Sequence, residues 1–153
     1  VPNPSTVSYP AILDFPAPTF KGYTKESTIA EKFQAMVKLG VLNSRMKDFY
    51  DIWVLSRTFD FKGKILAEAV EKTFEKRNTP VTLDAALFDP SFGKDGGKNV
   101  QWQGFIRKTK LVDAPESFEE VMDAVKFFLE PLAASIIERR NFNSNWIAPG
   151  PWR

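Results

Sequence analysis

The sequence predicts a mainly α-helical fold, a bundle of about five helices that follows an N-terminal extended or β-edge segment. Three observations predict it. Apolar residues recur at helical spacing in separate stretches, Gly and Pro punctuate the chain between those stretches, and the first 23 residues are crowded with proline. No apolar run approaches the roughly 20 residues that span a membrane, so we expect no membrane partner.

The composition restricts the possible chemistry. The chain of 153 residues contains no Cys and no His, which excludes disulfides, thiolate or imidazole metal ligands, and nucleophilic catalysis by Ser-His or Cys-His pairs. The lack of Cys fits a cytoplasmic location. A net charge of +2 does not by itself indicate a nucleic-acid-binding protein. Any chemistry must rest on carboxylates, Lys, Arg, hydroxyl groups and a hard metal such as magnesium.

The distribution of prolines and of helical periodicity divides the chain into three regions. Residues 1–23 form the extended segment, because closely spaced prolines exclude helices and central strands. The chain opens with VPNPSTV and no initiator Met, so we interpret this region as the end of a missing N-terminal domain. Residues 24–138 form the helical domain. Residues 139–153 form a tail, either docked or flexible, whose aromatic residues favour docking on the bundle or on a partner.

The first three helices have clear boundaries. Thr24 is a suitable N-cap for a helix that ends near Leu39, with Gly40 as its stop signal. The second helix starts at Asn43 or Ser44 and reaches about Phe59. The third covers residues 62–77, where apolar residues recur at helical spacing.

The following stretch, residues 81–98, reads as a loop with at most one helical turn at 83–88. Its GKDGGK sequence resembles a phosphate-binding loop but lacks the glycine spacing, and Asn99 stands where Ser or Thr would bind magnesium. We therefore interpret residues 93–98 as a mobile turn.

Two more helices are predicted after this loop. The first covers residues 99–111 and ends in basic residues, which act as ordinary helix capping or contact a nucleic-acid backbone. The second covers residues 116–130 with a broad apolar stripe. Pro131 is expected to kink that helix or to begin a new segment through Ile137.

Several charges fall on apolar helix faces. At 100° per residue, Glu26 and Lys32 lie inside the apolar arc of the first helix. Asp48 lies inside the apolar face of the second helix, and Asp51 lies at its border, close to Asp48. Arg45 lies at the basic start of the same helix. Buried charges need partners, so these residues must meet one another or a ligand.

Two interpretations of these charges stay open from the residue types. The structural one is a buried ion pair between Lys32 and Asp48. The functional one is a polar cleft in which Lys32 and Arg45 meet phosphates while Asp48 orients a substrate group or holds the lysine.

A family resemblance is carried by the AEK, NSRMKD and DFYD elements between Tyr9 and Phe59. At these spacings the segment closely resembles the later part of the AbiEii/AbiGii nucleotidyltransferase toxins of bacterial toxin–antitoxin, abortive-infection systems. A weaker, helical continuation reaches about Leu132. The resemblance implies transfer of a nucleoside monophosphate from an NTP, with Mg²⁺, to an acceptor such as the 3′ end of tRNA. It also implies a cognate antitoxin as partner.

The resemblance also implies roles for individual residues. Lys32 of the AEK element would contact the triphosphate. Asp48 and Asp51 of the DxxD element would be the active-site acids, and Arg45 and Glu26 occupy polar positions that would support the site.

One departure from the family pattern matters. The family's first motif, a Gly-Ser followed by closely spaced metal-binding aspartates, does not occur in this sequence. We therefore expect the C-terminal helical part of such a toxin, inactive by itself and holding neither NTP nor Mg²⁺ alone. The alternative is a non-catalytic helical interaction module, for example for an antitoxin, that keeps these residues as structural ion pairs.

Overall fold

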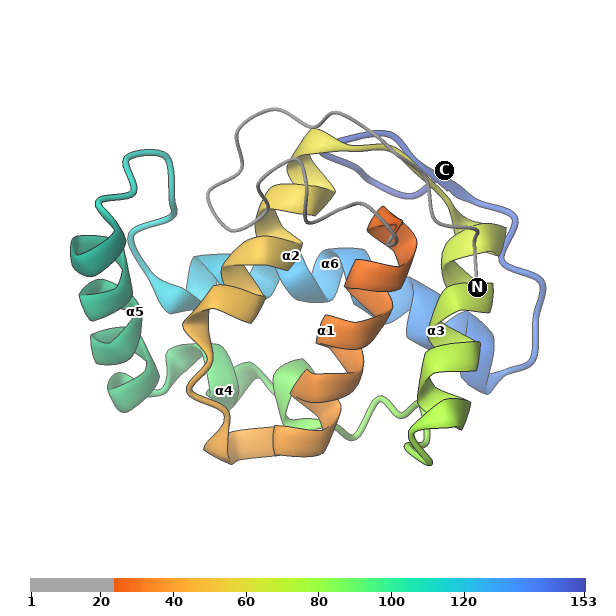
Figure 1. Ribbon diagram of the computed structural model, residues 1–153, viewed down its shortest axis with the longest axis horizontal. Coiled ribbons are helices and arrows are strands. Elements are labelled where there is room, and N and C mark those ends of the chain that lie inside the picture. Colours follow the sequence, from red (N-terminus) through yellow and green to blue (C-terminus); the bar gives the residue numbers. More distant parts are fainter. Residues whose placement is uncertain (1–23) are drawn as a thin grey trace.

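A computed structural model describes residues 24–153 (Figure 1). The predicted extended segment, residues 1–23, lies outside the described residues. The described chain forms six α-helices, two short 3₁₀ helices and two short strands. In order they are α1 (Lys25–Leu39), η2 (Gly40–Leu42), α2 (Met46–Thr58), β1 (Phe61–Lys62), α3 (Gly63–Lys76), η3 (Ala86–Phe88), α4 (Pro90–Lys94), α5 (Gly96–Thr109), α6 (Phe118–Ile137) and β2 (Asn145–Trp146). The mainly helical fold class is confirmed.

Helix α6 is the core helix against which most of the other helices pack. It runs behind α1 and α2 in Figure 1 and contacts α2, α3, α4 and α5. Of the two outcomes expected at Pro131, a kink or a new segment, the new segment does not occur, because α6 continues through this residue to Ile137. Phe128, Leu129 and Leu132 on either side of it are fully buried. Their packing outweighs the one backbone hydrogen bond that proline removes.

The start and end of α1 are as predicted. The Thr24 hydroxyl accepts a hydrogen bond from the Ser27 N–H at 3.0 Å, which caps the first turn. Gly40, with φ of +56°, follows the last turn in a conformation that favours glycine.

The predicted start of the second helix is two to three residues too early. Helix α2 begins at Met46, later than Asn43 or Ser44, and Arg45 holds the N-cap position without a side-chain hydrogen bond. The Asn43 side chain instead accepts a hydrogen bond from the Arg45 N–H at 2.8 Å. Asn43 thus shapes the turn before the helix rather than the helix itself.

The prediction of a loop over residues 81–98 is also wrong in its second half. Asp89 accepts a hydrogen bond from the Ser91 N–H and caps α4, whose first residue is Pro90. Asp95 accepts one from the Lys98 N–H at 2.8 Å and caps α5. Residues 93–98 therefore join two helices rather than forming a mobile turn, because two Asp caps offset the poor helix propensity of the glycines.

The C-terminal residues pack on the bundle. Strands β1 and β2 pair antiparallel, with Phe61 opposite Trp146. The Trp146 side chain is 1% exposed, and its indole N–H donates to the Ser56 carbonyl at the end of α2. The Trp152 ring stacks on Phe128 of α6 at 5.7 Å. None of the helices between Thr24 and Arg153 has the length and apolar character that a bilayer-spanning helix needs.

Candidate functional site

Helices α1 and α2 bring three of the predicted site residues together. The Lys32 ammonium lies 3.1 Å from Oδ1 of Asp48 and 2.8 Å from Oδ2 of Asp51. Lys32 comes from the middle of α1, and both aspartates come from the first two turns of α2. Lys32 and Asp48 lie inside the apolar arcs of their helices and Asp51 lies at the border of its arc, which explains why they face the same interface.

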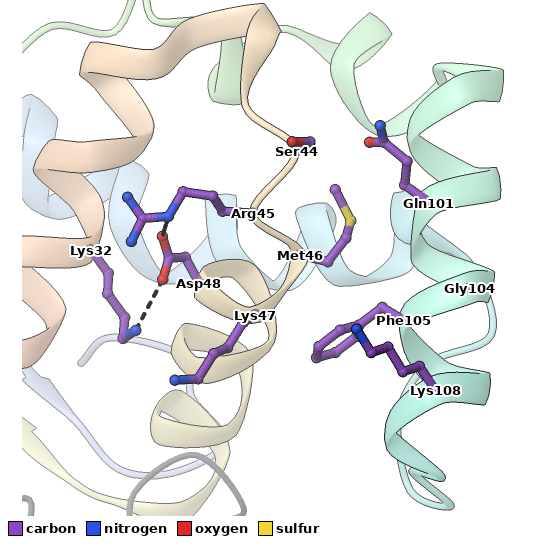
Figure 2. Close-up of a pocket in the computed structure, with 10 residues that line it drawn as sticks. All are labelled: Lys32, Ser44, Arg45, Met46, Lys47, Asp48, Gln101, Gly104, Phe105 and Lys108. Atoms are coloured by element: carbon purple, nitrogen blue, oxygen red, sulfur yellow. Dashed lines mark hydrogen bonds and ion pairs between the residues drawn. The ribbon is translucent and has the colours of Figure 1, made fainter.

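Arg45 extends this cluster towards solvent. Its Nε lies 2.9 Å from Oδ2 of Asp48, so Asp48 is held between Arg45 and Lys32 (Figure 2). The Arg45 side chain is 60% exposed, whereas the Asp48 side chain is 4% exposed. The cluster therefore has a buried acidic side and a solvent-accessible basic side.

The environment keeps Lys32 charged. Burial by itself would lower the pKa of Lys32, but the charges of Asp51 and Asp48 and their hydrogen bonds outweigh burial, so the pKa is raised. The Lys32 ammonium is thus a permanent cation at neutral pH. Asp51, whose side chain is fully buried, fixes its position.

Glu26 lies apart from this cluster. It is six residues before Lys32 on α1, about 9 Å along the helix axis, and its carboxylate lies 3.8 Å from Lys25. It lines a separate hollow of about 460 Å³ beside Phe61 and Trp146. Among the described residues the structure does not bring Glu26 together with Lys32.

A pocket of about 570 Å³ opens beside the cluster (Figure 2). One wall is formed by Lys32 and by residues 44–48 at the start of α2. The opposite wall is one face of α5, formed by Gln101, Gly104, Phe105 and Lys108. The lining holds four cationic side chains and one carboxylate, that of Asp48, so the pocket suits an anion.

Sequence reasoning missed the α5 wall. Its four residues recur with spacings of three, one and three, which places them on one helix face. That face combines an amide, a glycine, an aromatic ring and a lysine, a mixture unlike a core stripe. The signal was therefore present, but it showed neither which helix the face meets nor that a pocket lies between them.

Comparison with known proteins identifies the family. A family model described as nucleotidyl transferase AbiEii toxin, type IV toxin–antitoxin system, matches residues 1–124. The chain belongs to the AbiEii family. No curated protein and no solved structure matches the chain. The matched part contains the whole ion-pair cluster and the α5 wall, whereas the last turns of α6 and the C-terminal residues follow it.

Membership in the AbiEii family carries two consequences. A nucleotidyl transferase uses a nucleoside triphosphate, and a toxin of a type IV toxin–antitoxin system has an antitoxin. The use of an NTP and the existence of an antitoxin partner both agree with the expectations from the sequence.

The described residues do not fit the magnesium ion that the resemblance implies. No group of three or more Asp, Glu, His or Cys side chains that could hold a metal lies between residues 24 and 153. Asp48 and Asp51 are already bound by Lys32, and Asp48 also by Arg45. A divalent cation beside those two cations would be repelled. The carboxylates of Asp48 and Asp51 therefore bind basic side chains in this structure rather than a metal ion.

Proposed function

We propose that this AbiEii chain supplies the triphosphate-contacting side of a nucleotidyl transfer site. In this proposal Lys32 binds the phosphates of the NTP. Asp48 is the active-site acid, Asp51 holds Lys32 in place, and Arg45 adds a second cation at the pocket mouth. Glu26, in the first turn of α1, supports the site only indirectly, by stabilising that end of the helix.

The proposed reaction transfers a nucleoside monophosphate. A hydroxyl oxygen of the acceptor bonds to the α-phosphorus, the bond from that phosphorus to the bridging oxygen breaks, and pyrophosphate leaves with the electron pair. The hydroxyl proton passes to a base, for which Asp48 is the candidate at the pocket wall. A nucleic acid with a free 3′ hydroxyl, such as the end of a tRNA, is the proposed acceptor, and the antitoxin is the proposed regulatory partner.

The observation that carries the proposal is the position of Lys32. A lysine that only completes a structural ion pair has no need to line a pocket, yet Lys32 and Asp48 line one together with Arg45 and Lys47. Developing negative charge on a leaving pyrophosphate is stabilised by cations held in place beforehand. Two carboxylates on one ammonium group provide that fixed position.

The metal-binding Gly-Ser and Asp-x-Asp element does not occur in this sequence. We propose that it comes from outside this chain and completes the site.

The alternative remains a non-catalytic interaction module. It is favoured by the same contacts, because Lys32 is 15% exposed and already meets two carboxylates. In that case the cluster contributes only to stability.

The first prediction separates the two. In the longest protein that contains this chain, Lys32→Ala is expected to lower transfer of radiolabelled nucleoside monophosphate about 100-fold, because a transition-state cation is lost. The control is Lys38→Ala, an exposed lysine of the same helix that does not line the pocket. Full transfer with unchanged nucleotide affinity in Lys32→Ala would remove Lys32 from the site. A lower melting temperature with unchanged transfer would establish the structural alternative.

A further inference from the structure

Helix α5 carries a face that the cluster of Lys32, Asp48 and Asp51 does not explain. Gly104, Phe105 and Lys108 line the pocket opposite the start of α2. Figure 2 shows Phe105 and Lys108 extending from α5 towards α2. The Phe105 ring is held in place by Trp102 at 5.5 Å and by Tyr50 of α2 at 5.9 Å. The distance between the two walls is thereby fixed by aromatic packing.

Gly104 has no structural need to be glycine. It lies in the interior of α5, where glycine lowers helix stability relative to alanine. A Cβ at this position would meet nothing within 4 Å, so no close packing requires its absence. Its φ is not in the left-handed region. What the missing side chain does provide is open space on the wall of the pocket.

Two further lysines line the pocket, one on each wall. Lys47 comes from α2 and Lys108 from α5. Within residues 24–153 neither forms an ion pair with a carboxylate, whereas Lys32 and Arg45 do. The two lysines therefore leave the pocket with uncompensated positive charge, which suits a ligand with several negative charges.

We infer that α5 is the second wall of the nucleotide site, where Lys108 binds the phosphate tail of a nucleoside triphosphate and Gly104 leaves room for it. This inference rests on the proposed function, because the proposed function supplies the identity of the ligand, a nucleoside triphosphate. Lys108 is then a binding residue, and Phe105 offers an aromatic face to the nucleoside part.

The dimensions favour a small ligand over a nucleic-acid strand. A volume of about 570 Å³ lies within the range of small-molecule sites. A strand would need a charged groove that follows its backbone over several nucleotides, whereas the charge here converges on one pocket between two helices.

The second prediction is a binding measurement on this chain. The sequence predicts that this chain alone holds no NTP, whereas the basic pocket predicts that it does. We therefore expect inorganic tripolyphosphate and each of the four common NTPs to bind the wild-type chain in calorimetric titrations. Lys108→Ala should weaken binding of both probes about tenfold, the effect of one lost charge-assisted hydrogen bond. The matched control is Arg107→Ala, which removes the same charge from the same exposed helix end outside the pocket and should change affinity less than about twofold.

A substitution at Gly104 provides a second, independent test of the pocket. Gly104→Met should fill the space and weaken NTP binding at least about tenfold. This variant should melt no lower than the wild type, because methionine has a higher helix propensity than glycine and a Cβ at this position meets nothing within 4 Å. A loss of binding in Gly104→Met thus reports the pocket and not unfolding.

Three results would overturn the inference. These are wild-type affinity in both Lys108→Ala and Gly104→Met, no binding of tripolyphosphate or NTP by the wild-type chain, or preferential binding of a single-stranded oligonucleotide without a triphosphate. The proposed function fails separately, when Lys32→Ala leaves transfer intact. Weakened binding in Lys108→Ala together with intact transfer in Lys32→Ala would therefore retain the pocket and reject the role of Lys32.

Discussion

Lys32 shows how a buried charge is accommodated in this chain. Removing an ammonium group from water is expensive, and one carboxylate partner rarely compensates for it. Here Asp51 is fully buried against it and Asp48 is nearly so. The pair of acids keeps Lys32 charged and restricts its position, two properties that a phosphate-binding lysine requires.

The third prediction concerns the pH dependence of this cluster. The folded-state pKa of Lys32 is raised above its unfolded value. Its contribution to the free energy of unfolding is therefore fully present below the unfolded pKa of about 10.4 and is lost as pH rises through the folded pKa. The measurement is denaturant unfolding of the wild type and Lys32→Met between about pH 8 and about pH 12.

The wild type should be more stable than Lys32→Met by about 3 kcal/mol at the lower end, because the variant leaves buried carboxylates without their cation. The difference should shrink above about pH 10.4. Titration of the other lysines is common to both proteins and cancels. A difference that stays constant to the highest pH would contradict the raised pKa.

Among the elements, the junction of α4, α5 and α6 depends on one side chain. The Asn99 amide donates to the carbonyls of Gly93 and Asp95, and its carbonyl oxygen accepts from the Phe118 N–H at the start of α6. Asn99 thus orients α5, which carries Lys108, with respect to the core helix. The residue that looked out of place in a phosphate loop has a structural role.

The fourth prediction is that Asn99→Ala lowers the free energy of unfolding by about 2–3 kcal/mol, since it removes several hydrogen bonds at a partly buried junction. Val100→Ala is the control, because Val100 is 71% exposed on the same helix and should change stability by less than about 0.5 kcal/mol. Urea unfolding measures both. Equal effects would show that the Asn99 hydrogen bonds do not hold the junction.

Across the whole molecule, residues far apart in the sequence are joined by the C-terminal aromatics. Trp146 donates to Ser56 of α2 and packs edge-to-face on Phe128 of α6 at 4.8 Å. A Cβ on Gly150 would clash with the Trp146 ring, so glycine is required there. These contacts link the end of α2, the helix that carries Asp48, to the core helix α6.

The fifth prediction compares the two tryptophans. Trp146→Phe should lower the free energy of unfolding by about 2–3 kcal/mol, because it leaves the buried Ser56 carbonyl without its donor and opens a cavity. Trp152→Phe removes a similar hydrogen bond, to Phe128, at a half-buried position and should cost about 1 kcal/mol. Equilibrium denaturation measures both. A larger loss for Trp152→Phe would show that Trp152, not Trp146, attaches the C-terminal residues.

Several elements were predictable because their causes are local. Helical periodicity and capping residues placed four of the five long helices and the start of α6 within a few residues, and Thr24 and Gly40 mark the limits of α1. The short helix α4 also has a local signal, Asp89 before Pro90, which is typical of a helix start and was overlooked.

By itself the sequence determined the helical class and offered the pairing of Lys32 with Asp48 as one of two interpretations, since 100° spacing places both on apolar helix faces. It also carries the family, through motifs within the matched residues 1–124. The tertiary structure alone decided that Asp51 is more deeply buried than Asp48, that Glu26 lies elsewhere, and that α5 faces the cluster across a pocket. Those outcomes depend on which helix faces pack together over long sequence separations. Local periodicity shows that a face exists, and only packing shows what lies opposite it.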